Sequence, residues 1–128
     1  MILDSSAVVA IFLQEPGHEE VLQKLGSTDS RAIGAPTLAE TGIVLTSRMR
    51  RNAIGALARF LQEAEVATVP FGDDHWKETV DAWDRFGRRR HEASLNFGDC
   101  MTYSVAKLAD ESLLCIGDEF ALTDLRIA

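Results

Sequence analysis

Short apolar runs alternate along this chain with longer segments in which apolar residues recur every three or four positions. The runs are MIL at 1–3, RAIGA at 31–35, VATV at 66–69 and SLLCI at 112–116. A short, continuous apolar run between polar segments is typical of a buried strand. The pattern therefore predicts four strands.

Five longer segments between these runs have the apolar spacing of helices: 5–14, 18–26, 37–64, 73–91 and 97–110. In the last two, the residues that we expect to face a core are Trp76, Val80 and Trp83, then Phe97, Met101, Val105 and Leu108. The segment 37–64 is long for one helix and contains Asn52 and Gly55. We predict that it forms an antiparallel pair of helices that divides near Asn52.

Strands that alternate with helices predict an α/β fold of three layers, with a short, mostly parallel central sheet flanked by helices on both faces. No repeat or linker interrupts the pattern, so we expect one domain over 1–128. The longest apolar run, at 7–13, is far below the roughly 20 residues of a bilayer span, which predicts no membrane segment. The opening MILDSS lacks the positively charged residues that precede the apolar region of a secretory signal. We therefore expect a cytoplasmic location.

Four acidic residues follow predicted strands or begin predicted helices. Asp4 comes directly after the first run, Asp118 comes after the fourth, Glu40 lies one turn into the helix after the second, and Asp99 lies in the first turn of its helix. The carboxyl ends of parallel strands meet at one edge of a sheet, where ligands bind in such folds. We expect all four carboxylates at that edge.

Each acid also has a purely structural explanation. The alternatives are a capping box at Thr37–Glu40, a second at Asn96–Asp99, a cap of the first helix by Asp4, and a turn at Gly117–Asp118. Four carboxylates at one edge, however, raise one another's pKa unless a cation neutralises them. Oxygen ligands without a suitably spaced His or Cys favour Mg²⁺ or Mn²⁺ over Zn²⁺.

The formal net charge of −7 argues against a nucleic-acid partner, but the basic residues are not spread evenly. Seven of the 13 fall in two stretches: Arg48, Arg50 and Arg51 in the first, and Arg85, Arg88, Arg89 and Arg90 in the second. Each stretch alone is explained by a solvated helix end, where Arg and Lys are favoured. Beside clustered acids, the two stretches become candidates for binding a phosphate backbone.

Four motifs in this order resemble the PIN-domain ribonucleases, and more closely the VapC toxins of bacterial toxin–antitoxin pairs. They are MILDSSAVVAIFLQEPG, TLAETGIV, NFGDCMTYSVAKL and LLCIGDEFALTDL, and together they span nearly the whole chain. The resemblance implies a PIN domain over 1–128 in which Asp4, Glu40, Asp99 and Asp118 form an acidic quartet. The closing motif departs from the family in having Ile116 where a Ser or Thr often stands two residues before the aspartate.

The resemblance implies a Mg²⁺- or Mn²⁺-dependent endoribonuclease in which Asp4 and Asp99 hold the metal and Glu40 and Asp118 orient water or complete a second site. It also implies an RNA substrate gripped by the arginines, an inhibitory VapB-type antitoxin and a homodimer. A noncatalytic PIN-like module that binds RNA or a partner is the alternative. A phosphoacceptor receiver domain fits poorly, because Asp4 is followed by Ser5 and the last lysine, Lys107, lies within a predicted helix.

Overall fold

All four predicted strands are present in the computed structural model, which describes residues Met1–Ala128. They are β1 (Ile2–Leu3), β2 (Arg31–Gly34), β3 (Val66–Val69) and β4 (Leu113–Leu114). Every pairing is parallel, and the strand order is β3-β2-β1-β4. The predicted α/β fold is confirmed, with a sheet that is wholly rather than mostly parallel.

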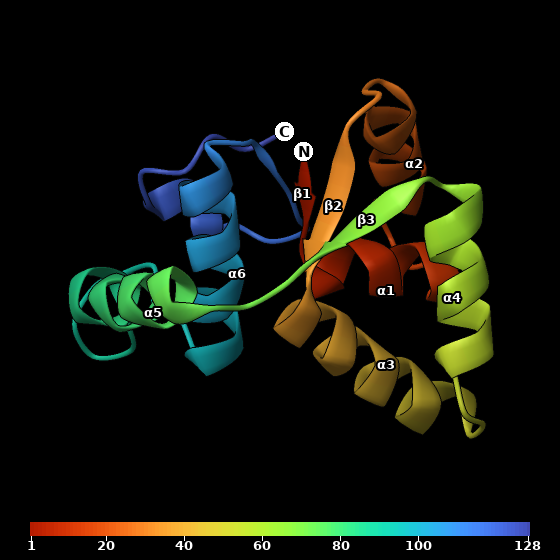
Figure 1. The fold of residues 1–128 in the computed structure, drawn as a ribbon, viewed down its shortest axis with the longest axis horizontal. Coiled ribbons are helices and arrows are strands. Elements are labelled where there is room, and N and C mark those ends of the chain that lie inside the picture. The colour runs from red at the N-terminus through yellow and green to blue at the C-terminus, as the bar shows by residue number, and fades with distance from the viewer.

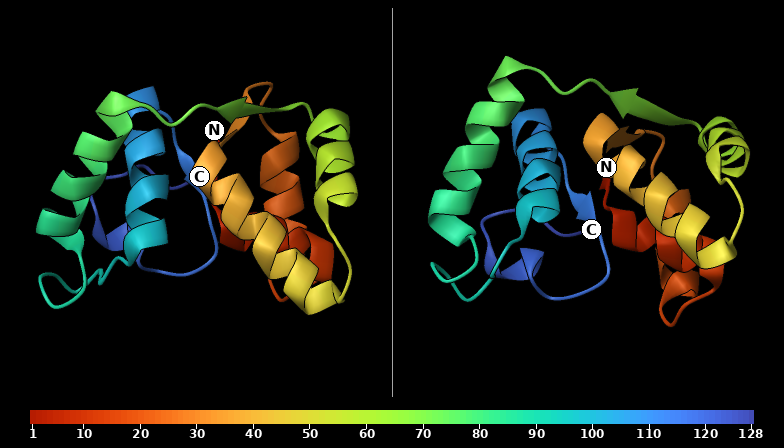
Figure 2. Two further views of the ribbon diagram at one scale, coloured as in Figure 1. Left: turned by 60° about the horizontal axis from the view of Figure 1, so that its bottom comes forward. Right: turned by 90° about the horizontal axis from the view of Figure 1, so that it is seen from below.

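Helices cover both faces of the sheet (Figure 1). They are α1 (Ser5–Leu13), α2 (His18–Gly26), α3 (Ala35–Met49), α4 (Ile54–Glu63), α5 (Asp73–Phe86), α6 (Phe97–Ala109) and the short 3₁₀ helix η1 (Phe120–Leu122). The first four helices lie on one side of the strands and α5 and α6 on the other, as the two views of Figure 2 also show. None of the helices combines the length and the apolar character that a membrane span requires.

Alternate residues of the strands enter two separate cores. Leu3, Ile33 and Leu114 pack with α1 to α4, whereas Ile2 and Leu113 pack with α5 and α6. Successive side chains of a strand point to opposite faces, so a strand that is covered on both faces must be apolar at every position. This explains why the strands read as continuous apolar runs in the sequence.

The segment 37–64 forms two helices, as predicted, and the division at 50–53 includes Asn52. The first of them, α3, begins at Ala35, two residues earlier than expected, with Gly34 as its N-cap. Thr37 therefore lies inside the helix, where its hydroxyl shares a hydrogen bond of 2.8 Å with that of Thr102. A capping box at Thr37–Glu40 is wrong as an explanation of Glu40.

The predicted core face of α5 is wrong. Trp76, Val80 and Trp83 are exposed, and the buried face of the helix carries Ala82 and Phe86 instead. Periodicity locates an apolar stripe on a helix, but it does not say which neighbour covers that stripe. Here the small Ala82 and the ring of Phe86 pack in the α5–α6 core, which leaves the tryptophan stripe facing outward.

The predicted helix 73–91 is too long. It ends at Phe86 with Gly87 as its C-cap, and residues 88–94 form turns that lead to α6. Reciprocal bonds fasten this loop, since Leu95 N–H donates to Phe86 O at 2.9 Å and Arg88 N–H donates to Leu95 O at 3.1 Å. The second arginine stretch therefore lies mostly in a loop rather than at a helix end.

The predicted core stripe of α6 is only partly right. Val105 is buried, whereas Leu108 is exposed and Phe97, the first residue of the helix, is 72% exposed. Phe97 lies where the chain enters the helix, before the first buried residue of α6, Cys100. The central turns of α6 alone are packed between α5 and the sheet.

Because the apolar stripe of α5 faces outward, the same Val→Ala substitution should lower the free energy of unfolding by different amounts at Val105 of α6 and at Val80 of α5. Val105→Ala removes methyl groups from a side chain that is 1% exposed, and should lower the free energy of unfolding by about 2 kcal/mol. Val80→Ala, at a side chain that is 60% exposed, should change it by less than about 0.5 kcal/mol. Urea unfolding of both variants measures the difference, and equal losses would contradict the outward placement of the stripe.

Candidate functional site

The carboxyl ends of the strands form one edge of the sheet, and α1, α3 and α6 all begin near it (Figure 1). Asp4 lies directly after β1, where its backbone N–H donates to Leu114 O of the neighbouring strand at 2.9 Å. Its side chain caps α1, with Oδ2 accepting from Ser6 N at 3.0 Å and Ser6 Oγ at 2.6 Å. Asp4 is a buried carboxylate, 6% exposed, and the predicted alternative that it caps this helix is confirmed.

Asn96 is the N-cap of α6, and Asp99, the third residue of the helix, completes the predicted capping box with it. Asp99 Oδ2 accepts from Asn96 N at 3.0 Å, and Asn96 Oδ1 accepts from Asp99 N at 2.9 Å. Burial raises the pKa of Asp99 to about 6, and the charges of Asp4, Glu119 and Glu40 act in the same direction against the hydrogen bond from Asn96. The second oxygen of Asp99 accepts no hydrogen bond and is available to a ligand.

Glu40 reaches the same edge from α3. Its Oε1 accepts a long hydrogen bond of 3.4 Å from Ser5 Oγ at the start of α1. Its Oε2 lies against Gly98, where a Cβ atom would come within 2.5 Å of it. Partial burial of this carboxylate, followed by the charge of Asp4, raises the pKa of Glu40. Glycine at position 98 therefore gives Glu40 its place beside Asp99.

Asp118 has no contact with the other three predicted acids among the structure's hydrogen bonds. It is exposed, directly after Gly117, and its charge is not among those that raise the pKa of Asp99. The neighbouring Glu119 does act on Asp99, and its carboxylate folds back over Gly117. Sequence reasoning missed Glu119. The only signal for it is its position next to Asp118, and the role of Asp118 stays a prediction.

Ser6 joins the loop of Asp118 to Asp4. Its hydroxyl accepts from the backbone N–H of Ile116 at 2.9 Å while donating to Asp4 Oδ2. The side chain of Ile116 packs toward Gly17 and the core around α1 and α2. The departure at Ile116 therefore removes a hydroxyl side chain but keeps the backbone of this loop tied to the acidic edge.

No basic side chain neutralises these acids. All ion pairs of the structure involve other carboxylates, and no three His, Cys, Asp or Glu side chains lie close enough to enclose a cation as they stand. The donor set is nonetheless made only of oxygen atoms, and Mg²⁺ usually takes one or two carboxylates and keeps several waters. Asp4 and Asp99, each with one oxygen left beside its capping bond, fit that chemistry.

The predicted RNA-binding arginines fall into two groups. Arg85 pairs with Asp81 and Asp124, and Arg90 pairs with Asp84 and lies over the ring of Trp83. The others are exposed and form no ion pair: Arg48, Arg50, Arg51, Arg88 and Arg89. Arg88 and Arg89 lie in the loop that leads into Asn96, whereas the first stretch lies at the opposite end of α3 from Glu40.

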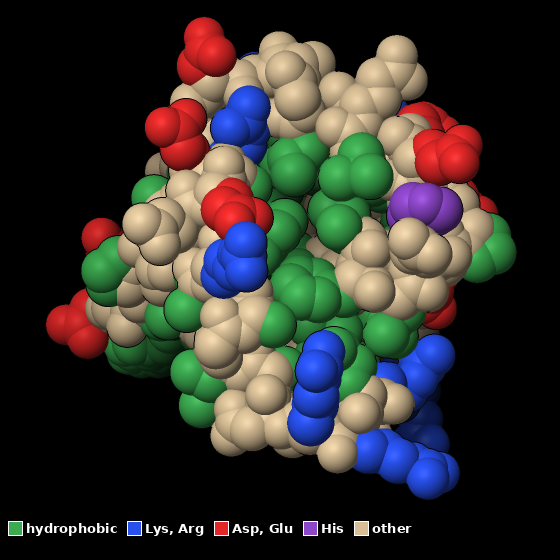
Figure 3. All heavy atoms as spheres, turned by 90° about the vertical axis from the view of Figure 1, so that its right-hand side faces the viewer, with side chains coloured by type: hydrophobic (Ala, Val, Ile, Leu, Met, Phe, Trp, Pro, Cys, Tyr) green, Lys and Arg blue, Asp and Glu red, His purple; other side chains and the backbone are tan.

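An apolar groove of about 820 Å³ lies beside the acidic edge rather than at it. Its floor and walls come mainly from α3 and α4, with Ile43 and Ile54 exposed along it. Figure 3 shows this hydrophobic face, with basic side chains at its lower end. The start of α3 lines the groove through Leu38 and Ala39, so one end of the groove adjoins Glu40.

Comparisons with known proteins identify the family of this chain. The model of the PIN domain family matches residues 1–124. Ribonuclease VapC36 of Mycobacterium tuberculosis is 42% identical over 98% of this chain and 91% of its own length. Ribonuclease VapC of Mycolicibacterium smegmatis is 36% identical over 98% of this chain and 97% of its own length.

Two solved structures share the fold. The Mycobacterium tuberculosis toxin VapC20, a sarcin-ricin loop cleaving toxin, superposes with a TM-score of 0.81 at 15% identity, covering 99% of this chain and 97% of its own. A chain of a toxin–antitoxin complex from Klebsiella pneumoniae superposes with a TM-score of 0.73 at 16% identity. The match covers 99% of this chain and 95% of that chain. With a family model that matches residues 1–124 and full-length relatives above 30% identity, this chain belongs to the PIN-domain family, within its group of VapC ribonucleases.

Proposed function

We propose that this chain is a metal-dependent endoribonuclease toxin, which hydrolyses RNA phosphodiester bonds with water and is inhibited by a VapB-type antitoxin. One observation carries the proposal. Asp4, Glu40 and Asp99 come from three helix starts to one edge of the sheet, and no basic side chain of the chain neutralises them. The names of the relatives support the same activity.

Asp4 and Asp99 are the residues that would hold Mg²⁺ or Mn²⁺. A divalent cation at such a site lowers the pKa of a coordinated water and offsets charge on the transition state of phosphodiester hydrolysis. The capping bonds fix the orientation of both carboxylates, because each spends one oxygen on a helix N-terminus. The ligands are therefore placed before any metal arrives.

Glu40 and the acids of the 118–119 loop have a different part in the proposal. The pKa of Glu40 is raised, which suits a carboxylate that accepts a proton from an attacking water. Ser5 donates to Glu40 Oε1 and so leaves Oε2 to face the edge beside Gly98. Glu119, and Asp118 as predicted from sequence, would orient water or complete a second cation site.

Phosphate must be attracted to this acidic edge by groups outside it. Arg88 and Arg89 are the best placed, since they are exposed, unpaired and in the loop that enters α6. Arg85 already forms ion pairs with Asp81 and Asp124. It is therefore a weaker candidate for RNA binding than the sequence indicates. The proposal therefore assigns RNA backbone contacts first to Arg88 and Arg89, and next to Arg48, Arg50 and Arg51.

The antitoxin is proposed to bind the apolar groove between α3 and α4. Its lining residues are mostly hydrophobic, and Ile43 and Ile54 would lose their exposed surface to an amphipathic segment. The groove adjoins Glu40, so a segment that continues past Ala39 can place a basic side chain among the carboxylates. The toxin–antitoxin complex from Klebsiella pneumoniae, which shares the fold, supports a partner of this kind. A homodimer is part of the same proposal, and the outward stripe of α5 offers it a second apolar surface.

Asp99→Asn tests the central claim. It removes ligand charge at nearly constant volume, and the amide oxygen can still accept from Asn96 N. We expect cleavage of RNA in Mn²⁺ to fall by at least about 10²-fold, on the scale of removing a principal electrostatic group of an active site, with an unchanged circular dichroism spectrum. Asp73→Asn, also in the first turn of a helix, is the matched control and should cleave normally. Full activity in Asp99→Asn would leave Asp99 as a cap alone and favour a noncatalytic module.

The raised pKa of Asp99 predicts a pH dependence of stability in EDTA. Asp99 holds its proton up to a pH of about 6 when folded but only to about 3.9 when unfolded. The stability that this proton contributes is complete below pH about 3.9 and is lost as the pH rises through about 6. The free energy of unfolding should therefore fall across this window by roughly 1 to 2 kcal/mol more in the unmutated chain than in Asp99→Asn.

The metal provides the counterpart of that measurement. At pH 7.5, Mn²⁺ should raise the melting temperature of the unmutated chain, because an ion that binds only the folded state stabilises it by about 2.7 kcal/mol at a hundredfold excess over its dissociation constant. Asp99→Asn should gain much less. Parallel pH curves for the two chains, with equal responses to Mn²⁺, would mean that the carboxylates do not share one site.

The free arginines predict the salt dependence of RNA binding. Arg88→Gln with Arg89→Gln should weaken binding of single-stranded RNA and lower the slope of log K against log salt by about 0.7 for each lost phosphate contact. Arg59→Gln, which removes the same charge from an exposed ion pair with Glu63, is the control. Filter binding with Asp99→Asn as the background separates binding from cleavage, and an unchanged slope would assign these arginines to solvent.

A further inference from the structure

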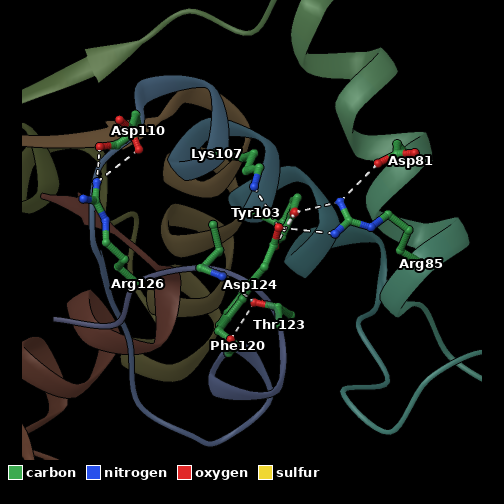
Figure 4. Close-up of polar contacts among 10 residues, drawn as sticks. Asp81, Arg85, Tyr103, Lys107, Asp110, Phe120, Thr123, Asp124 and Arg126 are labelled. Atoms are coloured by element: carbon green, nitrogen blue, oxygen red, sulfur yellow. Dashed lines mark hydrogen bonds and ion pairs between the residues drawn. The ribbon is translucent and has the colours of Figure 1, made fainter.

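The C-terminal segment of the chain is fastened by one carboxylate, Asp124. Its Oδ1 accepts from the hydroxyl of Tyr103 at 2.7 Å, and its Oδ2 accepts from Lys107 at 2.7 Å and from Arg85 at 3.2 Å. Figure 4 shows these side chains converging on Asp124 from α6 and α5. Partial burial acts to raise the pKa of Asp124, but these three hydrogen bonds hold it well below its ordinary value.

A run of hydrogen bonds leads from Asp124 back to the acidic loop. Leu125 N–H donates to the hydroxyl of Thr123, and that hydroxyl donates to Phe120 O at 2.6 Å. Within η1, Ala121 N–H donates to Asp118 O at 3.1 Å and Leu122 N–H to Glu119 O at 3.3 Å. Residues 118–125 therefore form one short, hydrogen-bonded segment. It begins at Asp118 and Glu119, and Asp124 anchors its other end.

The same loop is fastened at its other end by the acidic site itself. Ile116 N–H donates to Ser6 Oγ, which in turn donates to Asp4. Between the two anchors, Phe120 is buried against the core of α5 and α6. The position of Glu119 relative to Asp99 thus depends on one anchor at Asp4 and one at Asp124.

We propose that Asp124 is a positioning residue for the nuclease site, which holds the loop of Asp118 and Glu119 against α6 and so fixes Glu119 relative to Asp99. Tyr103 and Lys107 lie on α6, the helix that also carries Asp99. The bonds from Asp124 to α6 therefore hold the loop in a fixed position relative to Asp99. Their effect is not limited to the C-terminal end of the chain. The inference deepens the proposed function and depends on it for its catalytic part.

A second ion pair in the C-terminal segment has only a local effect and serves as a comparison for Asp124. Arg126 pairs with Asp110 at the far end of α6, and both side chains are largely exposed. That pair lies beyond Asp124, away from η1, and an exposed ion pair contributes little to stability. Asp124 differs because the donor from Tyr103 is buried and because three donors meet on one carboxylate.

The test compares Asp124→Asn with Asp81→Asn. Both remove one carboxylate that faces Arg85, but Asp81 lies on α5 and has no contact with the C-terminal segment. Hydrogen exchange of the amides at 116–122, measured in EDTA, is the readout that does not require activity. Asp124→Asn should speed exchange there by about tenfold or more, the scale of one lost charge-assisted hydrogen bond, while Asp81→Asn leaves it unchanged.

Kinetics in Mn²⁺ supply the second readout. Asp124→Asn should lower kcat by about tenfold with little change in KM for RNA, because the loop acids and not the RNA contacts are displaced. Asp124→Glu keeps the charge and should restore part of both signals. Should Asp124→Asn fail to fold, Tyr103→Phe removes a single bond of the anchor at constant ring size and should show the same changes in smaller degree.

Two results would separate the inference from the proposed function. Unchanged exchange at 116–122 in Asp124→Asn or Tyr103→Phe, with only a lower melting temperature, overturns the positioning role and leaves Asp124 as a stabilising residue. An unmutated chain that cleaves no RNA overturns the proposed function, while the exchange measurement still decides whether Asp124 holds the loop.

Discussion

The mutual repulsion of carboxylates at one edge of the sheet is the constraint on which the site depends. Parallel strands bring their carboxyl ends to the same edge, so residues that follow different strands meet there regardless of their separation in sequence. Asp4 and Glu40 reach this edge in this way, Asp99 comes to it at the start of α6, and burial together with the charges of Asp4, Glu119 and Glu40 raises the pKa of Asp99 to about 6. A fold that gathers charge like this needs local interactions that hold it in place.

Helix N-termini supply those interactions. Asp4 caps α1 and Asp99 completes the capping box of α6, so each anion faces the partly positive end of a helix and accepts from a backbone N–H that would otherwise lack a partner. Capping and ligand binding therefore do not exclude each other, because a carboxylate has two oxygens and each cap uses only one. Glu40 is held differently, by Ser5 and by the space that Gly98 leaves for it.

The two sides of the sheet contribute different parts of the molecule. The α1–α4 side provides Asp4, Glu40 and the apolar groove, and the α5–α6 side provides Asp99, the free arginines of the 88–89 loop and the anchor at Asp124. The site lies where these sides meet, so its geometry depends on packing across the sheet. Exposed apolar surface is found on both sides, at the groove, one end of which adjoins Glu40, and at the tryptophan stripe of α5.

The sequence by itself determined the elements and their order, because strands buried on both faces must be apolar throughout and helices keep a 3.6-residue period. It also predicted that Asp4, Glu40, Asp99 and Asp118 would share an edge; parallel topology accounts for Asp4 and Glu40, which follow strands, whereas Asp99 begins a helix that follows α5. Tertiary structure decided the rest. Whether Trp83 faces a core or solvent depends on what packs against α5, whether Arg85 is free depends on Asp124, 39 residues away, and whether Asp118 or Glu119 turns toward Asp99 depends on how η1 is fastened. These outcomes are set by contacts between residues distant in the chain, which no local pattern records.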